Sequence, residues 1–189
     1  MKLPIIAYGD PVLRKKAANI SSDYPDLNIL IENMFETMYA AHGVGLAAPQ
    51  VGLSIRLFII DATPFEEDDE ALKDFKKVFI NPEITEESGD KWSFNEGCLS
   101  IPDIREDVNR HQNLTITYLD QDWNEHTESY SGLAARVIQH EYDHIEGKLF
   151  TDKLSPLRKA MLKNRLDSIS KGFVKVDYKM KFPALKKKR

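Results

Sequence analysis

Apolar residues recur at helical spacing between residues 25 and 42, in the segment PDLNILIENMFETMYAAH. The positions that share this spacing are Leu27, Leu30, Ile31, Met34, Phe35, Met38 and Tyr39. A period close to 3.6 residues predicts an amphipathic helix whose apolar stripe packs in the core rather than binding a cofactor. Ser22 or Asp23 could cap the start of this helix, and Gly43 follows its end.

Shorter segments have the pattern of strands. RLFIID (56–61) and VFINPEI (78–84) are short apolar runs of the kind found in buried strands. LTITYLD (114–120) alternates β-branched and aromatic residues, and NEHTESYSG after it predicts a return strand across a turn near residues 122–124. The acidic, proline-containing segment 62–77 predicts a solvated loop with room for one helical turn.

Helical periodicity returns from Ser131 to about Glu146, with Gly147 as the expected C-cap. Pro156 then begins a further helix, PLRKAMLKNRLDSIS. FVKVDYKM (173–180) predicts a last strand. Helices and strands do not alternate strictly, so an α+β fold is predicted in preference to a doubly wound sheet.

The length of 189 residues is enough for one domain with a full hydrophobic core. We therefore expect a single domain over residues 1–178 and a basic C-terminal tail over residues 179–189. No stretch is long and apolar enough to predict a membrane span, and the N-terminus lacks the apolar core of a signal peptide. Cys98 is the only cysteine, so no intrachain disulfide can form and a reducing, cytoplasmic location is expected.

Charge is distributed unevenly along the chain. Residues 171–189 contain eight basic residues and one acid. Since the net charge of the whole chain is −4, residues 1–170 carry −11. An acidic body does not fit a general or sequence-specific nucleic-acid binder, whose footprint is a basic face.

The stretch QHEYDHIEG, residues 139–147, contains the first candidate chemistry. His140 and His144 are offset by about 40° and roughly 6 Å of rise in the predicted helix, so both imidazoles face the same way. This geometry suits the binding of one metal ion, with Glu141 beside a bound water. On this pattern alone, a metal site and a pair of surface histidines are equally supported.

Two other stretches change that balance. NEGCLSIP (95–102) contains Cys98, and GVGLAAPQ (43–50) consists almost entirely of small residues. Taken separately, a lone cysteine usually packs as a small hydrophobe, and a Gly-Ala run usually forms a tight loop. Together with the two histidines, the Cys98 thiolate completes the three protein ligands typical of a catalytic metal site that keeps a fourth position for water.

The same stretches indicate a hydrolytic mechanism. An open metal site lowers the pKa of its water, and Glu141 can take and then return the proton. The Gln50 amide and the backbone N–H of Leu99 could stabilise the negative charge on an attacked carbonyl. Gly43 and Gly45 have no side chains, so an extended peptide could pair with the backbone of this loop.

GVGLAAPQ, EGCLS and QHEYDH, in this order and at these spacings, resemble the three signature motifs of peptide deformylase. GDPVLR, SIPDIR and HIEGKLF are also similar to sequences of this family, so the resemblance covers most of residues 4–153. It implies an α+β fold in which mixed and antiparallel β-sheets pack around a central metal-binding helix, with a long N-terminal helix and a C-terminal helix.

The resemblance also implies an activity and a cofactor. The activity is removal of the N-terminal formyl group from formyl-methionyl nascent polypeptides, by attack of metal-bound water on the formyl carbonyl. The cofactor is one Fe²⁺ per chain, held by Cys98, His140 and His144, with Zn²⁺, Ni²⁺ or Co²⁺ as substitutes.

The remaining site residues follow from the same motifs. Glu141 matches the acid/base of the family, and Gln50 with the Leu99 amide matches its carbonyl-polarising pair. The residues that match positions beside the bound peptide are Gly43, Val44 and Gly45 and, after the cysteine, Arg105 and Arg110.

Two other interpretations use the same histidines. A zinc peptidase of the H-E-x-x-H kind takes its third ligand from a downstream histidine or carboxylate, but only Glu146 and Asp152 follow His144 closely. Cys98 fits the third place better. A closed structural site needs four protein ligands, and the remaining histidines are not in ligand-like clusters: His42, His111 and His126.

Two features leave alternatives open. Glu96 and Arg136, which lies four residues before His140, form either a buried support pair or a surface salt bridge. The segment KMKFPALKKKR (179–189) is either a solvated tail or a weak electrostatic contact with the ribosome, whose surface is RNA phosphate.

Overall fold

The computed structural model describes residues 1–67 and 69–183. Its centre is a five-stranded antiparallel sheet with the strand order β2-β3-β4-β5-β6. The strands of this sheet are β2 (Gly45–Ala47), β3 (Leu57–Asp61), β4 (Lys76–Cys98), β5 (Ile101–Leu119) and β6 (Glu125–Ser131). A separate parallel pair consists of β1 (Ile5–Ile6) and β7 (Met180–Lys181). The described α-helices are α1 (Leu27–Ala40), α2 (Gly132–Ile145) and α3 (Pro156–Ser170). The predicted α+β fold is confirmed.

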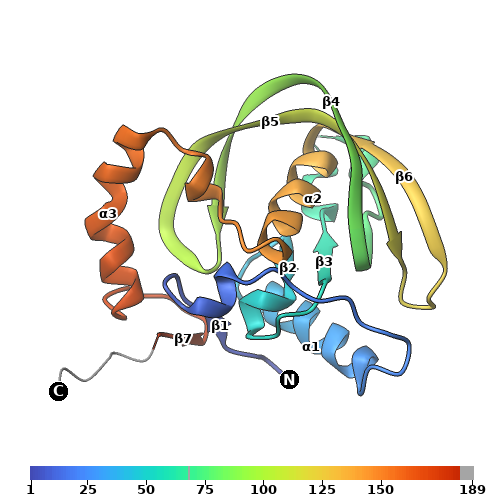
Figure 1. The fold of residues 1–189 in the computed structure, drawn as a ribbon, viewed down its shortest axis with the longest axis horizontal. Helices are drawn as coiled ribbons and strands as arrows, with labels where there is room; N and C mark the ends of the chain where they lie inside the picture. The colour runs from blue at the N-terminus through green and yellow to red at the C-terminus, as the bar shows by residue number, and fades with distance from the viewer. Residues whose placement is uncertain (68, 184–189) are drawn as a thin grey trace.

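Strand β3 is buried on both faces, which explains its unbroken apolar run. Successive side chains of a strand point to opposite faces. Phe58 and Ile60 therefore pack in a core cluster shared with α2, and Leu57 and Ile59 pack in another shared with α1. Figure 1 shows the long strands β4 and β5 arching over α2, so that this helix is enclosed by the sheet.

The helices lie where the apolar spacing predicts them. Helix α1 is shorter than the predicted segment 25–42 at both ends. Its N-cap is Asp26, with a left-handed φ of 53°, rather than Ser22 or Asp23, and its last residue is Ala40, with Ala41 as the C-cap. Helix α3 begins with Ser155 as N-cap, whose hydroxyl accepts a hydrogen bond from the Arg158 N–H. Within the described residues, no helix combines the length and the apolarity required to cross a bilayer.

Strands β4 and β5 extend far beyond the predicted segments 78–84 and 114–120. They pair continuously from Ile80 with Leu119 to Cys98 with Ile101, through four register shifts. Much of the additional length, TEESGDKWS (85–93), is polar and exposed. This part does not pack against the core, so its sequence does not alternate between apolar and polar residues. Its strand structure comes from backbone pairing with β5.

The strand predicted at 173–180 is wrong for most of its length. Only Met180 belongs to a strand, β7, and the residues before it lie outside both sheets. The Ile5 and Ala7 N–H groups donate to the carbonyls of Lys179 and Lys181 at 2.8 and 2.9 Å. The start of the predicted tail therefore pairs with β1, and residues 184–189 of that tail lie outside the described residues.

The acidic segment 62–77 is not the fully solvated loop that its composition predicts. It contains two short 3₁₀ helices, Thr63–Phe65 and Glu70–Leu72, and its last two residues already belong to β4. Leu72 and Phe75 are buried in the core cluster shared with α2. Because these two apolar positions are surrounded by charged residues, the composition of the segment does not predict that it packs against the core.

We expect Leu72→Ala to lower the free energy of unfolding by about 2–5 kcal/mol, because Leu72 is fully buried and a cavity adds to the lost transfer energy. The exposed neighbour Lys73 is the matched control, and Lys73→Ala should change the same free energy by less than about 0.5 kcal/mol. Urea unfolding curves measure both values. Equal stability of the two variants would show that the acidic segment adds nothing to the core.

Candidate active site

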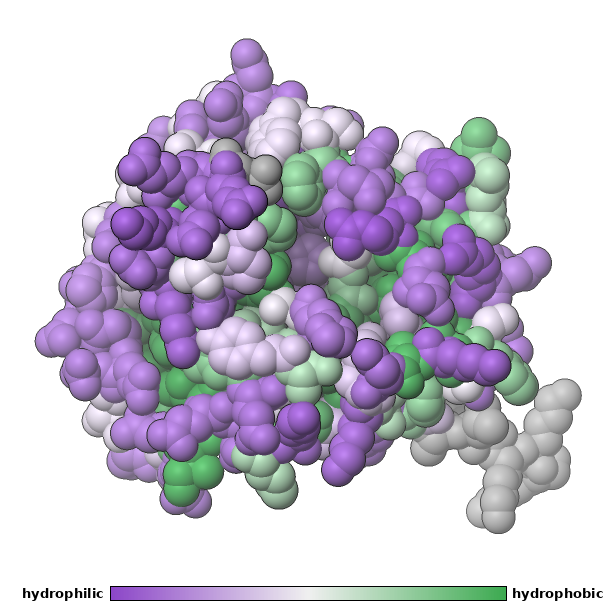
Figure 2. Space-filling view, turned by 180° about the vertical axis from the view of Figure 1, so that it is seen from behind, coloured by the Kyte–Doolittle hydropathy of each residue, from purple (hydrophilic) through white to green (hydrophobic). Residues whose placement is uncertain are grey.

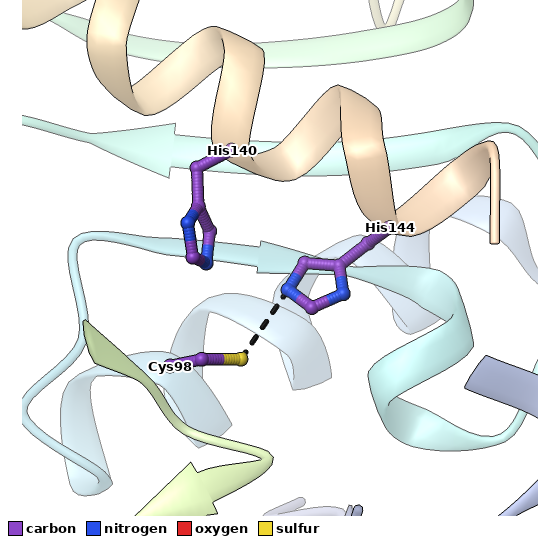
Figure 3. Close-up of side chains that lie close together, drawn as sticks. All are labelled: Cys98, His140 and His144. Carbon is purple, nitrogen blue, oxygen red and sulfur yellow. Dashed lines mark hydrogen bonds between the residues drawn. The ribbon is translucent and has the colours of Figure 1, made fainter. Parts of the chain in front are cut away.

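Three potential metal ligands converge where the end of β4 meets α2. His140 and His144 both project from α2 toward Cys98, the last residue of β4 (Figure 3). The two imidazole centroids are 5.1 Å apart, and His144 Nε2 lies 3.4 Å from Cys98 Sγ. One potential ligand atom from each residue lies within 4.8 Å of the other two. The structure thus brings together the three side chains that the sequence predicts as ligands.

Glu96, near the end of β4, fixes the orientation of His140. His140 Nδ1 lies 2.9 Å from Glu96 Oε2 and must donate to it, because an ionised carboxylate only accepts. The other ring nitrogen, Nε2, is then the one available to a metal. Although burial opposes its ionisation, hydrogen bonds from His140 and Arg110 hold the pKa of Glu96 well below its usual range.

Two buried arginines neutralise Glu96. Arg110 donates to its two carboxylate oxygens at 2.7 and 3.0 Å, and Arg136 Nη1 donates at 2.9 Å. The buried support pair of Glu96 and Arg136 is therefore confirmed over the surface salt bridge. Arg110 also donates to Asp143 of α2 at 2.6 Å. The predicted place of Arg110 beside the substrate is wrong, because its guanidinium is enclosed in this network and does not line the cleft described below.

The two histidines differ in their protonation. Burial opposes a charge on His140, but the Cys98 and Glu96 side chains raise its pKa to about 10. Burial and the neighbouring His140 put the pKa of His144 well below its usual value, so this imidazole is neutral. A cation at this site would take the place of the His140 proton, because only a deprotonated nitrogen is a ligand. One thiol and two imidazoles directed at a common point fit a borderline-soft cation.

Glu141 is buried beside these ligands. Its Oε2 has no hydrogen-bond partner among the described residues, and burial raises its pKa to about 7. A β-carbon added at Gly45 would lie 2.7 Å from Glu141 Cδ and 2.8 Å from its Cγ. Any larger residue at position 45 would displace the carboxyl group, so Gly45 allows β2 to pass directly against it.

Gln50 is oriented with its NH₂ group toward Cys98. The Ala47 N–H donates to Gln50 Oε1 at 2.9 Å, which fixes which end of the amide faces the site. Gln50 Nε2 lies 3.5 Å from Cys98 Sγ and 3.4 Å from Ser100 Oγ. A side-chain donor therefore stands beside the candidate ligands.

A cleft of about 860 Å³ opens onto these residues. One wall is segment 41–45, which follows α1, and the opposite wall is the turn between β4 and β5. Apolar side chains that line the cleft include Phe65, Phe94, Leu133 and Val137. In Figure 2, this face of the molecule is hollowed near its centre, with a polar floor and both apolar and polar residues at the rim.

The predicted substrate-binding residues Gly43, Val44, Gly45 and Arg105 all line this cleft. Arg105 is exposed, and it donates to the Asn95 side-chain oxygen at 2.9 Å and to the Asn95 carbonyl at 2.6 Å. Leu99 lines the opposite wall, and a β-carbon at Gly43 would lie 2.7 Å from its Cδ1. The two walls therefore meet at these residues.

Part of the cleft comes from a segment that no sequence motif associates with the site. Residues of this segment that line the cleft are Lys175, Val176, Asp177 and Tyr178. No motif marks them. The alternation in FVKVDYKM predicts an extended segment, but local pattern cannot indicate what that segment lies against.

The chain is similar to known proteins in both sequence and fold. A family model described as polypeptide deformylase matches residues 2–160. The peptide deformylase of Christiangramia forsetii is 63% identical over 196 aligned positions, and that of Flavobacterium johnsoniae is 57% identical over 196, with 100% of both chains covered in each case.

A solved structure extends the similarity to three dimensions. The crystal structure of a peptide deformylase from Legionella pneumophila has a TM-score of 0.79 at 39% identity, covering 92% of this chain and 98% of that chain. Because sequence and fold agree over almost the whole length, the chain belongs to the peptide deformylase family, hydrolases that remove the formyl group from the N-formylmethionine of nascent peptides.

Proposed function

We propose that this chain hydrolyses the formyl amide of formyl-methionyl nascent polypeptides at one metal centre held by Cys98, His140 and His144. The observation that carries the proposal is the position of these side chains beside buried Glu141, next to an open cleft. Three ligands leave a fourth position open, which a closed structural site does not. A cysteine as third ligand, in place of a residue downstream of His144, favours a deformylase over a zinc peptidase.

Fe²⁺ is the metal that we propose, one per chain, with Zn²⁺, Ni²⁺ or Co²⁺ as substitutes. One thiolate and two imidazoles suit all of these cations, and the family resemblance favours iron. When bound, such a cation lowers the pKa of a coordinated water toward neutrality and polarises a carbonyl.

Glu141 is proposed to move the proton. A pKa of about 7 keeps both protonation states accessible near neutral pH, which is the condition for efficient general acid–base catalysis. Its unpartnered Oε2 can accept a proton from water, and the resulting carboxylic acid can return that proton to the departing amine.

Gln50 Nε2 and the Leu99 N–H are proposed to hold the formyl oxygen. Because the Ala47 N–H fixes the Gln50 amide, this donor is in place before the carbonyl gains charge, as effective stabilisation requires. Leu99 directly follows Cys98, so its N–H is one residue away from a candidate ligand.

The peptide chain of the substrate is proposed to lie along Gly43, Val44 and Gly45. Strand β2, which begins at Gly45, is the edge strand of the sheet, so an extended peptide can pair with the side of β2 that does not face β3. The apolar lining residues suit a methionine side chain. Arg105 offers a positive charge on the opposite wall.

The substrate also implies where the protein acts. Formylated nascent chains emerge at the ribosome, so we infer a cytoplasmic location and a weak contact with ribosomal RNA through the basic segment 179–189. RNA phosphate would repel the acidic remainder of the chain, and basic residues could overcome this repulsion by releasing counterions. Lys179 adjoins β7 and Lys181 belongs to it, so changing either residue could disturb the pairing of β7 with β1. The test therefore uses the basic residues at 186–189, which lie outside the described residues.

We expect Glu141→Gln to retain its metal and to lose at least about 10² in kcat on a formyl-methionyl peptide, because no carboxylate remains to move the proton. Metal analysis and steady-state kinetics on the same preparation measure both effects. Glu86→Gln, which alters an exposed glutamate of β4, is the matched control and should match the parent. Near-normal turnover of metal-loaded Glu141→Gln would remove Glu141 from the mechanism, and a metal-loaded parent without deformylase activity would contradict the proposed function.

We expect the Fe²⁺ form to lose activity in air faster than a Zn²⁺ or Ni²⁺ form, because Fe²⁺ and the Cys98 thiolate are both oxidisable. The measurement is the half-life of activity after anaerobic purification, in air and under argon. Equal half-lives of the Fe²⁺ form in the two atmospheres would count against iron.

We expect deletion of residues 184–189 to reduce co-sedimentation with ribosomes at low salt and to leave kcat/KM on a short formyl peptide unchanged. This truncation keeps β7 intact, so the pairing with β1 is not disturbed. A full-length variant with glutamine at 186–189 separates the loss of charge from the loss of length and should behave like the truncation. If both variants sediment like the parent, the segment is a solvated tail only.

A further inference from the structure

After α3, residues 173–178 lead back to the cleft, which the last four of them line. The side chains of this segment alternate between half-buried positions, Val174, Val176 and Tyr178, and exposed positions, Phe173, Lys175 and Asp177. One face of the segment therefore lies against the protein, although the segment belongs to neither sheet.

Two consecutive residues of this segment contact opposite walls of the cleft. The Tyr178 hydroxyl donates to the Leu99 carbonyl at 2.8 Å, on the turn between β4 and β5. Asp177 Oδ2 lies 3.1 Å from His42 Nε2, in the loop before β2. The Asp177–His42 contact is exposed on both sides and contributes little free energy, so the hydrogen bond of Tyr178 is the stronger constraint.

The turn that carries Leu99 is held at two carbonyls from outside the sheet. Tyr178 donates to the Leu99 carbonyl, and the Tyr8 N–H donates to the Ser100 carbonyl at 2.8 Å. Tyr8 follows β1, and Tyr178 precedes β7. Because β1 and β7 pair with each other, both donors are tied to one small structure formed by the two ends of the described chain.

We propose that Tyr178 is a positioning residue, whose hydroxyl holds the Leu99 turn so that the Leu99 N–H meets the formyl oxygen. The inference rests on the role proposed above for that N–H. The Leu99 N–H and the Leu99 carbonyl belong to successive peptide planes that share the Leu99 Cα, so anchoring the carbonyl limits the displacement of this Cα and of the N–H on its other side. A backbone donor stabilises developing charge fully only when it is already in place, and misplacement by about 1 Å can cost about 10²-fold in rate.

The chemical state of Tyr178 suits this role. Burial, together with the nearby Cys98 and Asp103 side chains, raises the pKa of the Tyr178 hydroxyl well above its usual value. The hydroxyl therefore stays protonated and remains a donor at every pH at which the site would operate.

The test compares Tyr178→Phe with the parent, both as the full chain loaded with the same metal. The substitution keeps the ring and removes only the hydroxyl. We expect kcat to fall about 10-fold with KM within about 2-fold, a smaller loss than the about 10²–10³ that follows removal of an oxyanion donor itself. Tyr24→Phe is the matched control, because Tyr24 is another half-buried tyrosine but packs in the α1 cluster and does not line the cleft.

Two further readouts distinguish positioning from a general structural role. With a thioformyl peptide, whose sulfur is a weaker hydrogen-bond acceptor, the loss in Tyr178→Phe should be smaller than with the formyl peptide. Exchange of the Leu99 and Ser100 amide hydrogens should be about 10-fold faster in Tyr178→Phe, because the turn opens more readily.

Each unfavourable outcome is informative. A kcat within 2-fold of the parent, an effect on KM alone, or an equal loss with formyl and thioformyl peptides would overturn the proposal. A parallel loss of metal or of thermal stability that accounts for the lower activity would also overturn it, because Tyr178 would then be structural. Failure of the proposed function is separate, since it appears as an inactive metal-loaded parent before any variant is made.

Discussion

The buried carboxylate of Glu96 is the interaction on which the arrangement of the site depends. Glu96 comes from β4, and it binds Arg110 of β5 and both Arg136 and His140 of α2. Removing these charges from water is costly, and the network is stable only because each carboxylate oxygen receives charged or polar donors. The position of α2 along β4 is therefore fixed, and Cys98, two residues beyond Glu96, reaches the histidines.

Enclosure of α2 by the arching strands has an electrostatic consequence. Burial keeps His144 neutral, so its imidazole has a free nitrogen lone pair. Burial also raises the pKa of Glu141 to about 7, so this carboxyl can change its protonation state near neutral pH. Water would weaken both effects, because a high dielectric favours the charged forms of these groups. The glycine at position 45 allows β2 to close over Glu141 without a side chain between them.

The two ends of the described chain contribute to the same cleft. The β1–β7 pair lies next to two residues that contact the turn at Leu99: Tyr178 donates to the Leu99 carbonyl, and the Tyr8 N–H donates to the adjacent carbonyl of Ser100. The shape of the cleft therefore depends on residues outside the three motifs. Chains that share those motifs but differ after α3 are expected to differ at this wall.

Local pattern was sufficient for the helices α1, α2 and α3, for β3 and β6, and for the pair His140 and His144, because helical period, strand alternation and the spacing of the two histidines act within a few residues. Cys98 could be added as the third ligand only by combining motifs that lie far apart in the sequence, since a lone cysteine carries no local sign of metal binding. The sequence left open whether Glu96 and Arg136 meet in the interior, placed Arg110 beside the substrate, and treated 62–77 as solvent-exposed. Tertiary structure decided these points, since burial depends on which distant segment covers a residue. It also decided the length of β4 and β5 and the position of Tyr178. Contacts between residues far apart in the sequence produce no hydrophobic periodicity in a polar segment, so the local sequence cannot predict them.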